Sequence, residues 1–470
     1  VRAHREILLA RTLVALGEFD DARTLAMRAL ADAKLSGSPR SEADALRQMG
    51  MALDGLHRPE DSIEQLEQAR RHYESLGLTD GLAAVDNAVA RLLARIALSE
   101  PDPDQQAVRL DEALQRSSRS LDYVDRLLGK VSAPELRAWY GASYRDYYQA
   151  HIDLLLQRNG IDANPGNRYV SEALSTSERA RARMMMDLLN EASVDLQREI
   201  DPGIAAEMEE LIDKLSTSSE RRERILTEGG VNDHARGELT ALSEEIAFIE
   251  NQLALKQLEL RRANHHYRAL TAPHTVTVSA LQRLIASDSI MLQYFLADER
   301  SFVWVVTDDA VHVREIAGSE IINAAAARLI ASLSTPNRYP VAGIEQRDAL
   351  RSISELVLQP VADLIGARRV IVVADGMLNY LPFHTLLLAE SDEDRALLDT
   401  REVVTLPSMS VLAALIERRE DEDAPRSIAI FADPVFNLTD PRLVSVNGRR
   451  PVARTQSESE REWATRPVLS

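Results

Sequence analysis

The residues that could do chemistry are few, and the most suggestive of them lie in one stretch. Residues 368–392, RRVIVVADGMLNYLPFHTLLLAESD, run from a short apolar segment into Asp375-Gly376 and on to Pro382, Phe383 and His384. A strand that ends in a tight turn is a common place for functional groups in α/β proteins, and histidine is the side chain that most often moves protons. The stretch is either a working site or the scaffold of one.

Nucleophiles and metal ligands are scarce elsewhere in the sequence. The chain contains no cysteine, which excludes disulfides, thiolate metal sites and a cysteine nucleophile within these residues. His265 and His266 have no histidine or carboxylate one helical turn away, and Ser408 in LPSMS has no neighbouring base. The phosphate-loop, dinucleotide, HExxH and GxSxG motifs do not occur. The sequence therefore predicts no catalytic, cofactor-binding or metal-binding residue.

Two kinds of charged cluster have simpler interpretations than a binding site. Arg179, Arg181 and Arg183, in SERARARMMMDLL, are spaced i, i+2, i+4 and so spread around a helix without forming one patch. We expect a solvated face there and not an anion site. The acidic runs at 392–394 and 420–423 are expected to be solvated loops.

Composition bounds the class of protein. The 470 residues carry 55 basic and 74 acidic side chains, a formal charge of −19, which argues against nucleic acid and against anionic membrane surfaces. No apolar run approaches the roughly 18–20 residues that span a bilayer, and the N-terminus does not have the pattern of a signal peptide. We therefore expect a cytoplasmic protein. Because the chain begins with Val1, we also expect a processed or incomplete chain.

The first third of the sequence repeats itself at an offset of 40 residues. Leu9, Leu13 and Leu16 share one face of a predicted helix, and the same columns recur as Met49, Leu53, Leu56 and as Val89, Leu93, Ile96. Small residues keep the same step, in the columns Ala10/Gly50/Ala90, Ala22/Ser62 and Ala29/Ala69. Small residues let helices approach closely, so the pattern predicts a helical solenoid. An irregular bundle of amphipathic helices is the alternative.

One segment of this region resembles a known repeat. In ALGEFDDARTLAMRAL, Gly17, Phe19, Ala22 and Ala29 stand at the positions typical of the tetratricopeptide repeat. That repeat has a period of about 34 residues, and we expect the extra residues to lie in loops such as LSGSPRSE. The second repeat departs from the pattern, with His57 and Pro59 in place of Gly17 and Phe19. The resemblance implies a concave face that binds a peptide or protein partner.

A helical hairpin is predicted after the repeats. Apolar residues step by four and three from Ile204 to Leu215 and again from Leu239 to Leu253, which is the spacing of a coiled-coil seam. Gly229-Gly230 between them favours a reversal of the chain.

The character of the sequence changes near residue 271. Three β-branched runs, within 289–318, are separated by turn residues and predict adjacent, mostly antiparallel strands. Helices are predicted at 320–333 and about 345–366. RRVIVVAD, TREVVTLPS and RSIAIFADP predict buried strands that alternate with helices, as in a layered α/β domain.

Residues 275–436 resemble the first half of a CHAT domain, a caspase-like module often found behind tetratricopeptide repeats. The resemblance rests on VTVSALQRLIASDSIMLQYFLADERSFVWVVT, VVADGMLNYLPFHTLL, VVTLPSMSVLAAL and IAIFADPVF in that order, preceded by SERARARMMMDLL. It implies the fold of cysteine peptidases related to caspases, with a histidine in a His-Gly pair and a cysteine nucleophile. Both are expected beyond the Asp-Pro segment. The chain has no His-Gly pair, and 34 residues follow Phe436.

The opening stretch is therefore interpreted as scaffold. His384 is not at the position that the resemblance assigns to the catalytic histidine, and we expect it to be a packing residue. Asp375-Gly376 should form a turn in which Gly376 has positive φ, and Pro382-Phe383 should anchor the next segment in the core. Ser408 is expected to be a turn residue.

The sequence as a whole predicts an α + α/β protein. We expect an N-terminal α-helical repeat solenoid over 1–190, a long helical hairpin over 191–270, and the partial caspase-like α/β layered domain over 271–470. The expected function is that of a caspase-like cysteine peptidase regulated through protein binding by the repeats, of which this chain is an inert part. Alternatives are a non-enzymatic scaffold with a degenerate CHAT fold, and a regulatory protein whose α/β part binds a small ligand. No oligomeric state is predicted.

Overall fold

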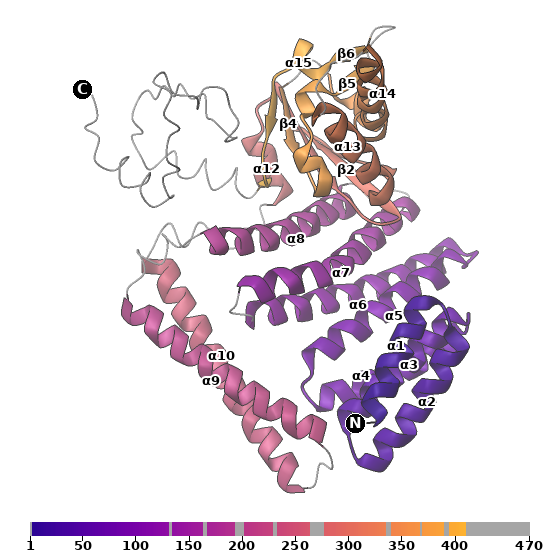
Figure 1. The fold of residues 1–470 in the computed structure, drawn as a ribbon, viewed down its shortest axis with the longest axis vertical. Coiled ribbons are helices and arrows are strands. Elements are labelled where there is room, and N and C mark those ends of the chain that lie inside the picture. Colours follow the sequence, from indigo (N-terminus) through magenta and orange to yellow (C-terminus); the bar gives the residue numbers. More distant parts are fainter. Residues whose placement is uncertain are drawn as a thin grey trace, which may run out of the picture. The chain divides into compact units, whose positions relative to one another are not determined.

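The computed structural model describes residues 2–130, 134–162, 167–192, 202–228, 233–263, 277–334, 340–366, 369–389 and 394–409. These residues form an α + α/β fold in which a long series of helices precedes a mixed sheet (Figure 1). All of them lie in one compact unit, Val1–Glu417.

The helical series begins with paired helices joined by very short turns. They are α1 (Arg2–Leu16), α2 (Phe19–Ser36), α3 (Pro39–Gly55), α4 (Pro59–Ser75), α5 (Thr79–Leu98) and α6 (Pro103–Lys130). A residue with positive φ follows or ends the helix at each of the first four turns: Gly17, Gly37, His57 and Gly77. The expectation that extra residues lie in loops was wrong, because LSGSPRSE is mostly helical and α2 itself is 18 residues long.

Small residues pack these helices together, as the sequence predicts. Ala10, Ala22, Ala29, Ala69 and Ala90 are fully buried. A Cβ on Gly50 would lie only 2.7 Å from Cγ of Leu66, so α3 and α4 approach too closely for a larger residue.

The large residues of the first helix behave differently from the prediction. Leu9 and Leu16 are 55% and 67% exposed, and the buried face of α1 is formed by Ala3, Ile7 and Ala10. The reason is that α1 packs on α2 and α3 through the face that carries Ala10. Leu13 of the same predicted face is partly buried, and its counterparts in the later repeats, Leu53 and Leu93, are buried.

The predicted helical hairpin is present. After α7 (Pro134–Ile161) and α8 (Arg168–Ala192) come α9 (Pro202–Glu228) and α10 (Asp233–Ala263), which pack on each other. Leu215, Ile246 and Ile249 are buried in their seam. Ion pairs at both ends of the hairpin, Arg221–Glu238 and Lys256–Glu207, show that the two helices are antiparallel. Gly229-Gly230, His265-His266 and Pro273 lie outside the described residues.

The strands of the sheet come from two parts of the sequence that are separated by a helical region. The short helix α12 (Val278–Leu284) precedes β1 (Ser289–Phe295), β2 (Arg300–Val306) and β3 (Val311–Ala317), and later come β4 (Arg369–Val373) and β7 (Val403–Thr405). The order is β3-β2-β1-β4-β7. The first three strands are antiparallel neighbours, as predicted, whereas β1–β4 and β4–β7 are parallel pairs.

Smaller elements complete this half of the chain. They are α13 (Ser319–Ser334), α14 (Pro340–Val357), η2 (Gln359–Leu364), η3 (Gly376–Tyr380), η4 (Phe383–Thr385), the hairpin of β5 (Leu387–Ala389) and β6 (Asp394–Ala396), and α15 (Leu397–Thr400). The helix predicted at 345–366 is divided into α14 and η2 because Pro360 supplies no N–H to continue it. The predicted strand within RSIAIFADP lies outside the described residues.

Helices cover both faces of the sheet. Ile290, Leu292 and Tyr294 of β1 pack with residues of α13 and α14 in one core. The alternate side chains Met291 and Phe295 face a second core that includes residues of α7, α8 and α12. Trp304 of β2, which is fully buried, donates from Nε1 to the carbonyl of Val170 in α8 at 3.3 Å. Helices α7 and α8 therefore also form, with α12, one layer of the α/β sandwich.

Candidate functional site

Asp375 and Gly376 form the turn that the sequence predicts at the end of β4. The Gly376 N–H donates to Oδ1 of Asp375 at 3.0 Å, and Gly376 has φ of 52°, which suits glycine. Phe383 is 2% exposed and packs against the ring of Tyr294, so it anchors the following segment as expected. His384 is exposed at the surface, so the expectation that it is a packing residue was wrong.

The other carboxylate oxygen of Asp375 has a role that the sequence does not reveal. Oδ2 accepts hydrogen bonds from the Leu296 N–H at 2.7 Å and from Nη2 of Arg145 in α7. The same guanidinium donates to the Leu296 carbonyl at 2.8 Å and lies over the ring of Phe295. Arg145 thus ties α7 to the point where β1 and β4 end side by side.

A second arginine makes a similar connection from α8. Arg181 donates from Nη1 to the Ala374 carbonyl and from Nη2 to the Tyr294 carbonyl at 2.7 Å. These two carbonyls lie at the ends of the adjacent parallel strands β1 and β4, one residue beyond the paired residues Gln293 and Val373. One guanidinium therefore satisfies backbone acceptors of both strands at once.

Neighbouring residues of α8 extend this contact. Glu178, which is 1% exposed, lies 3.5 Å from Nε of Arg181 and accepts from the Met409 N–H at 3.1 Å. Gln293 of β1 donates to Oγ of Ser177 at 3.0 Å. We call the set of Arg145, Ser177, Glu178, Arg181 and Asp375 the joint.

The joint corrects the prediction of a solvated arginine face. Arg181 is bound to the sheet, and Arg179 is paired with Asp125 and lies 3.4 Å from Asp122 in α6. The i, i+2 spacing does place Arg179 and Arg181 on different sides of α8, as predicted. Each side, however, faces another part of the protein, so Arg181 binds the sheet and Arg179 binds α6. The side chain of Arg183 lies outside the described residues.

What the joint does chemically is hold charge and backbone in place. The carboxyl ends of parallel strands are where α/β proteins place their sites, and here that edge is occupied by arginines and carboxylates that bind one another. Ser408 is buried next to Met409, whose N–H donates a hydrogen bond to Glu178. Among the described residues no three His, Cys, Asp or Glu side chains are grouped to hold a metal ion.

In the helical part of the chain, arginines of α3 and α5 lie near tyrosines of α7. Arg91 of α5 donates to the Asp146 carbonyl of α7 at 3.2 Å, and the rings of Tyr144 and Tyr147 of α7 meet edge to face at 5.2 Å. Burial raises the pKa of Tyr147, and the nearby charges of Arg47 in α3 and Arg91 oppose that shift. We call Arg47, Arg91, Tyr144 and Tyr147 the inner row.

The described helices include none long and apolar enough to cross a membrane.

Comparison with known families identifies both ends of this arrangement. The tetratricopeptide repeat family matches residues 3–75, which comprise α1 to α4 and decide in favour of repeats over an irregular bundle. The CHAT domain family matches residues 347–466, which begin within α14 and include β4, the Asp375 turn and β7. No curated protein matches the chain. The chain therefore carries a tetratricopeptide repeat region and, behind it, a CHAT domain.

Proposed function

We propose that the helical repeats bind a protein or peptide in the cytoplasm and that the joint transmits this binding to the CHAT domain. In this proposal, the activity that the repeats regulate is that of a caspase-like cysteine peptidase. These 470 residues contain no cysteine, so cleavage would need a nucleophile outside them and this chain is inert by itself. Tetratricopeptide repeats generally mediate protein–protein interaction.

The observation that carries the proposal is the double role of α7. Tyr144 and Tyr147 lie in the inner row, while Arg145 between them binds Asp375 at the carboxyl edge of β4. Less than one helical turn separates the residues that would meet a partner from the residue that holds the sheet. A shift of α7 on binding would therefore act directly on the Asp375 turn.

The composition of the inner row supports a peptide partner. Tyrosine and arginine are, with tryptophan, the residue types enriched at the energetic centres of protein interfaces. Arg47 already binds Tyr73, whose hydroxyl donates to Asp44 at 2.6 Å, so its guanidinium is held in place before a partner arrives. Binding of a partner then costs less free energy, because this side chain is already ordered.

Binding can be tested with a displayed library of random peptides selected on the purified chain. The Tyr147→Ala and Arg91→Ala variants should each bind the selected peptides at least about tenfold more weakly. Tyr380→Ala and Arg283→Ala, at exposed positions of η3 and α12, are matched controls that should bind as the unaltered chain does. Equal binding by all four variants would contradict a partner on the inner row.

The inert state of this chain is tested separately. A mixed fluorogenic peptide library should show no hydrolysis by the purified chain above the buffer rate, and hydrolysis that survives further purification would refute this part of the proposal.

A non-enzymatic scaffold is the second candidate, and the lack of cysteine in the 470 residues is the observation in its favour. The two functions differ in the native protein isolated from its source. A cysteine-directed peptide probe that labels the native protein supports the peptidase, and a native protein that binds peptide but takes no label supports the scaffold.

A further inference from the structure

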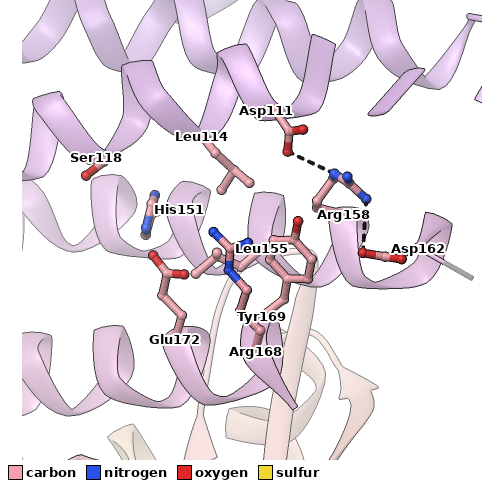
Figure 2. A pocket seen from close by; sticks show the side chains of 10 residues that line it. All are labelled: Asp111, Leu114, Ser118, His151, Leu155, Arg158, Asp162, Arg168, Tyr169 and Glu172. Carbon is pink, nitrogen blue, oxygen red and sulfur yellow. Dashed lines mark hydrogen bonds and ion pairs between the residues drawn. The ribbon is translucent and has the colours of Figure 1, made fainter. Parts of the chain in front are cut away.

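A cavity of about 460 Å³ lies between α6, α7 and α8 (Figure 2), and none of its lining residues belongs to the joint or to the inner row. Each helix contributes one face: Asp111 and Leu114 from α6, His151 and Leu155 from α7, and Tyr169 from α8. The volume is in the range of sites that bind small organic molecules.

Three charged residues that line the cavity are already paired with one another. Arg158 donates to Asp111 at 2.9 Å and lies 3.7 Å from Asp162, as the dashed lines in Figure 2 show. Arg158 also lies over the ring of Tyr169. This network builds one wall of the cavity and supplies no free charge of its own.

Two other charges line the cavity without an ion pair. Arg168 and Glu172 are one turn apart on α8, and neither is within salt-bridge distance of an opposite charge in the described part of the chain. The guanidinium of Arg168 is held over the Tyr169 ring, 5.3 Å from its centroid, by a cation–π contact. The cavity therefore presents one available cation and one available anion close together.

A buried imidazole and two leucines complete the lining. His151 is 5% exposed, and its Nδ1 is 2.9 Å from Oγ of Ser117. No hydrogen bond from a described residue reaches its Nε2, and burial, with the charge of Arg179, lowers the pKa of His151 to about 4. The ring is thus neutral at pH 7 and turns toward Glu172 in Figure 2. Leu114 and Leu155 supply apolar surface beside it.

We propose that this cavity binds a free amino acid with an apolar side chain. The α-carboxylate would bind Arg168, the α-ammonium group would bind Glu172, Nε2 of His151 would take a further hydrogen bond, and the side chain would contact Leu114 and Leu155. A purely anionic ligand would meet the carboxylates of Asp111, Asp162 and Glu172, and a purely cationic one would meet Arg158 and Arg168. A zwitterion satisfies both of the available charges.

The proposal does not depend on a peptide partner or on peptidase activity. It places a small-molecule site in the helical part of the chain, whereas the sequence suggested the α/β part as the place for a small ligand. Failure of the peptide selection described above would leave it standing.

Calorimetric titration of the purified chain with L-leucine and L-phenylalanine tests the ligand class. At least one of them should bind saturably at millimolar concentrations or below, and the analogues of the amino acid that binds should each bind at least about tenfold more weakly, because each lacks one charge. The analogues are the amide, without the carboxylate, and the N-acetyl derivative, without the ammonium group. Absence of saturable binding by both amino acids, or an analogue that binds as well, would overturn the proposal.

Variants then locate the site. Arg168→Gln and Glu172→Gln should each weaken binding of the amino acid at least about tenfold. Because both residues are exposed at the edge of the cavity, the variants should keep the melting temperature of the unaltered chain. Arg11→Gln and Glu209→Gln, exposed on α1 and α9, are matched controls that should bind normally. Unchanged affinity in the first pair would overturn the assignment.

Discussion

The repeats of α1 to α4 and the joint hold helices in place by opposite means. In the repeats the contacts are short-range and mainly apolar, with small residues such as Ala10, Gly50 and Ala69 buried between consecutive helices. At the joint the contacts are polar and join residues that are far apart in the sequence, as in Arg181 with Ala374, which are 193 positions apart. The repeats resemble one another and share their stability among many similar interfaces, whereas the joint depends on two arginines and one aspartate.

The comparison teaches where a perturbation is felt. Loss of one contact in a repeat should be felt mainly in neighbouring helices, because repeats make most of their contacts with adjacent repeats. Loss of one partner at the joint leaves buried charges and backbone groups without a partner, which is costlier than the contact itself. Stability and coupling should therefore respond most strongly at the joint.

The largest expected effect is that of Asp375→Ala. It removes the acceptor of both Arg145 and the buried Leu296 N–H, and we expect a loss of about 3 kcal/mol in the free energy of unfolding. Urea denaturation of the full chain measures it. Asp348→Ala, on an exposed position of α14, is the control and should change stability by less than about 0.5 kcal/mol. Similar losses in the two variants would mean that the joint is no stronger than the surface.

Gly50→Val should destabilise the repeats by about 2 kcal/mol, because α3 and α4 leave no room for side-chain atoms beside Leu66. Gly160→Val is a matched control, since a Cβ on Gly160, near the end of α7, would meet no atom within 4 Å. Thermal melts followed by circular dichroism distinguish the two. A Gly50 variant as stable as the control would show that the predicted close packing is not needed.

A further helix–sheet contact should respond to pH. Asp153 of α7 lies 3.1 Å from Arg300 of β2, and burial raises the pKa of Asp153 to about 6 from its ordinary value of 3.8, although Arg300 partly opposes this. The folded state then holds the proton more tightly than the unfolded state. The stability that Asp153 contributes is full below about pH 4 and is lost as the pH rises through 6.

Asp153→Asn should therefore gain stability relative to the unaltered chain between pH 4 and pH 7, by on the order of 1–2 kcal/mol. Urea denaturation at both pH values gives the difference. A difference that stays constant across this range would show that the carboxylate titrates at its ordinary pKa.

The smallest effect concerns the turns between repeats. His57 has φ of 57°, the left-handed conformation that Gly17, Gly37 and Gly77 adopt at the equivalent turns. His57→Gly should therefore stabilise the chain by about 0.5–1 kcal/mol, and the reciprocal Gly17→His should destabilise it by a similar amount. Melting temperatures of the two variants should move in opposite directions, and movement in the same direction would refute the shared turn geometry.

The sequence predicts the helical part well because its signals are local. Buried small residues at a fixed offset, the seam of α9 and α10, and the antiparallel strands β1 to β3 all follow from spacing along one segment. Leu9 and Leu16 show the limit of that approach, because periodicity finds a face but does not say which face the neighbouring helices cover. The turn at Gly376 and the buried Phe383 were predictable for the same local reason.

The joint was not predictable, because no local pattern connects its members. Arg145 and Asp375 are 230 positions apart, and an arginine on a helix looks the same whether it faces water or a sheet edge. The prediction that Arg181 faces solvent was wrong for this reason. The contact of Arg181 with the sheet could be predicted only by knowing that α8 covers the face of the sheet that carries Met291 and Phe295.

Hydrogen exchange of the Leu296 amide tests most directly whether α7 and α8 hold the carboxyl edge of the sheet. In a chain with Arg145→Met and Arg181→Met, we predict that this amide exchanges at least about tenfold faster, because Asp375 loses the charge that positions it. The amides of Ser62 and Gly50 in the repeats should keep their protection. Unchanged protection of Leu296 in the double variant would contradict the account.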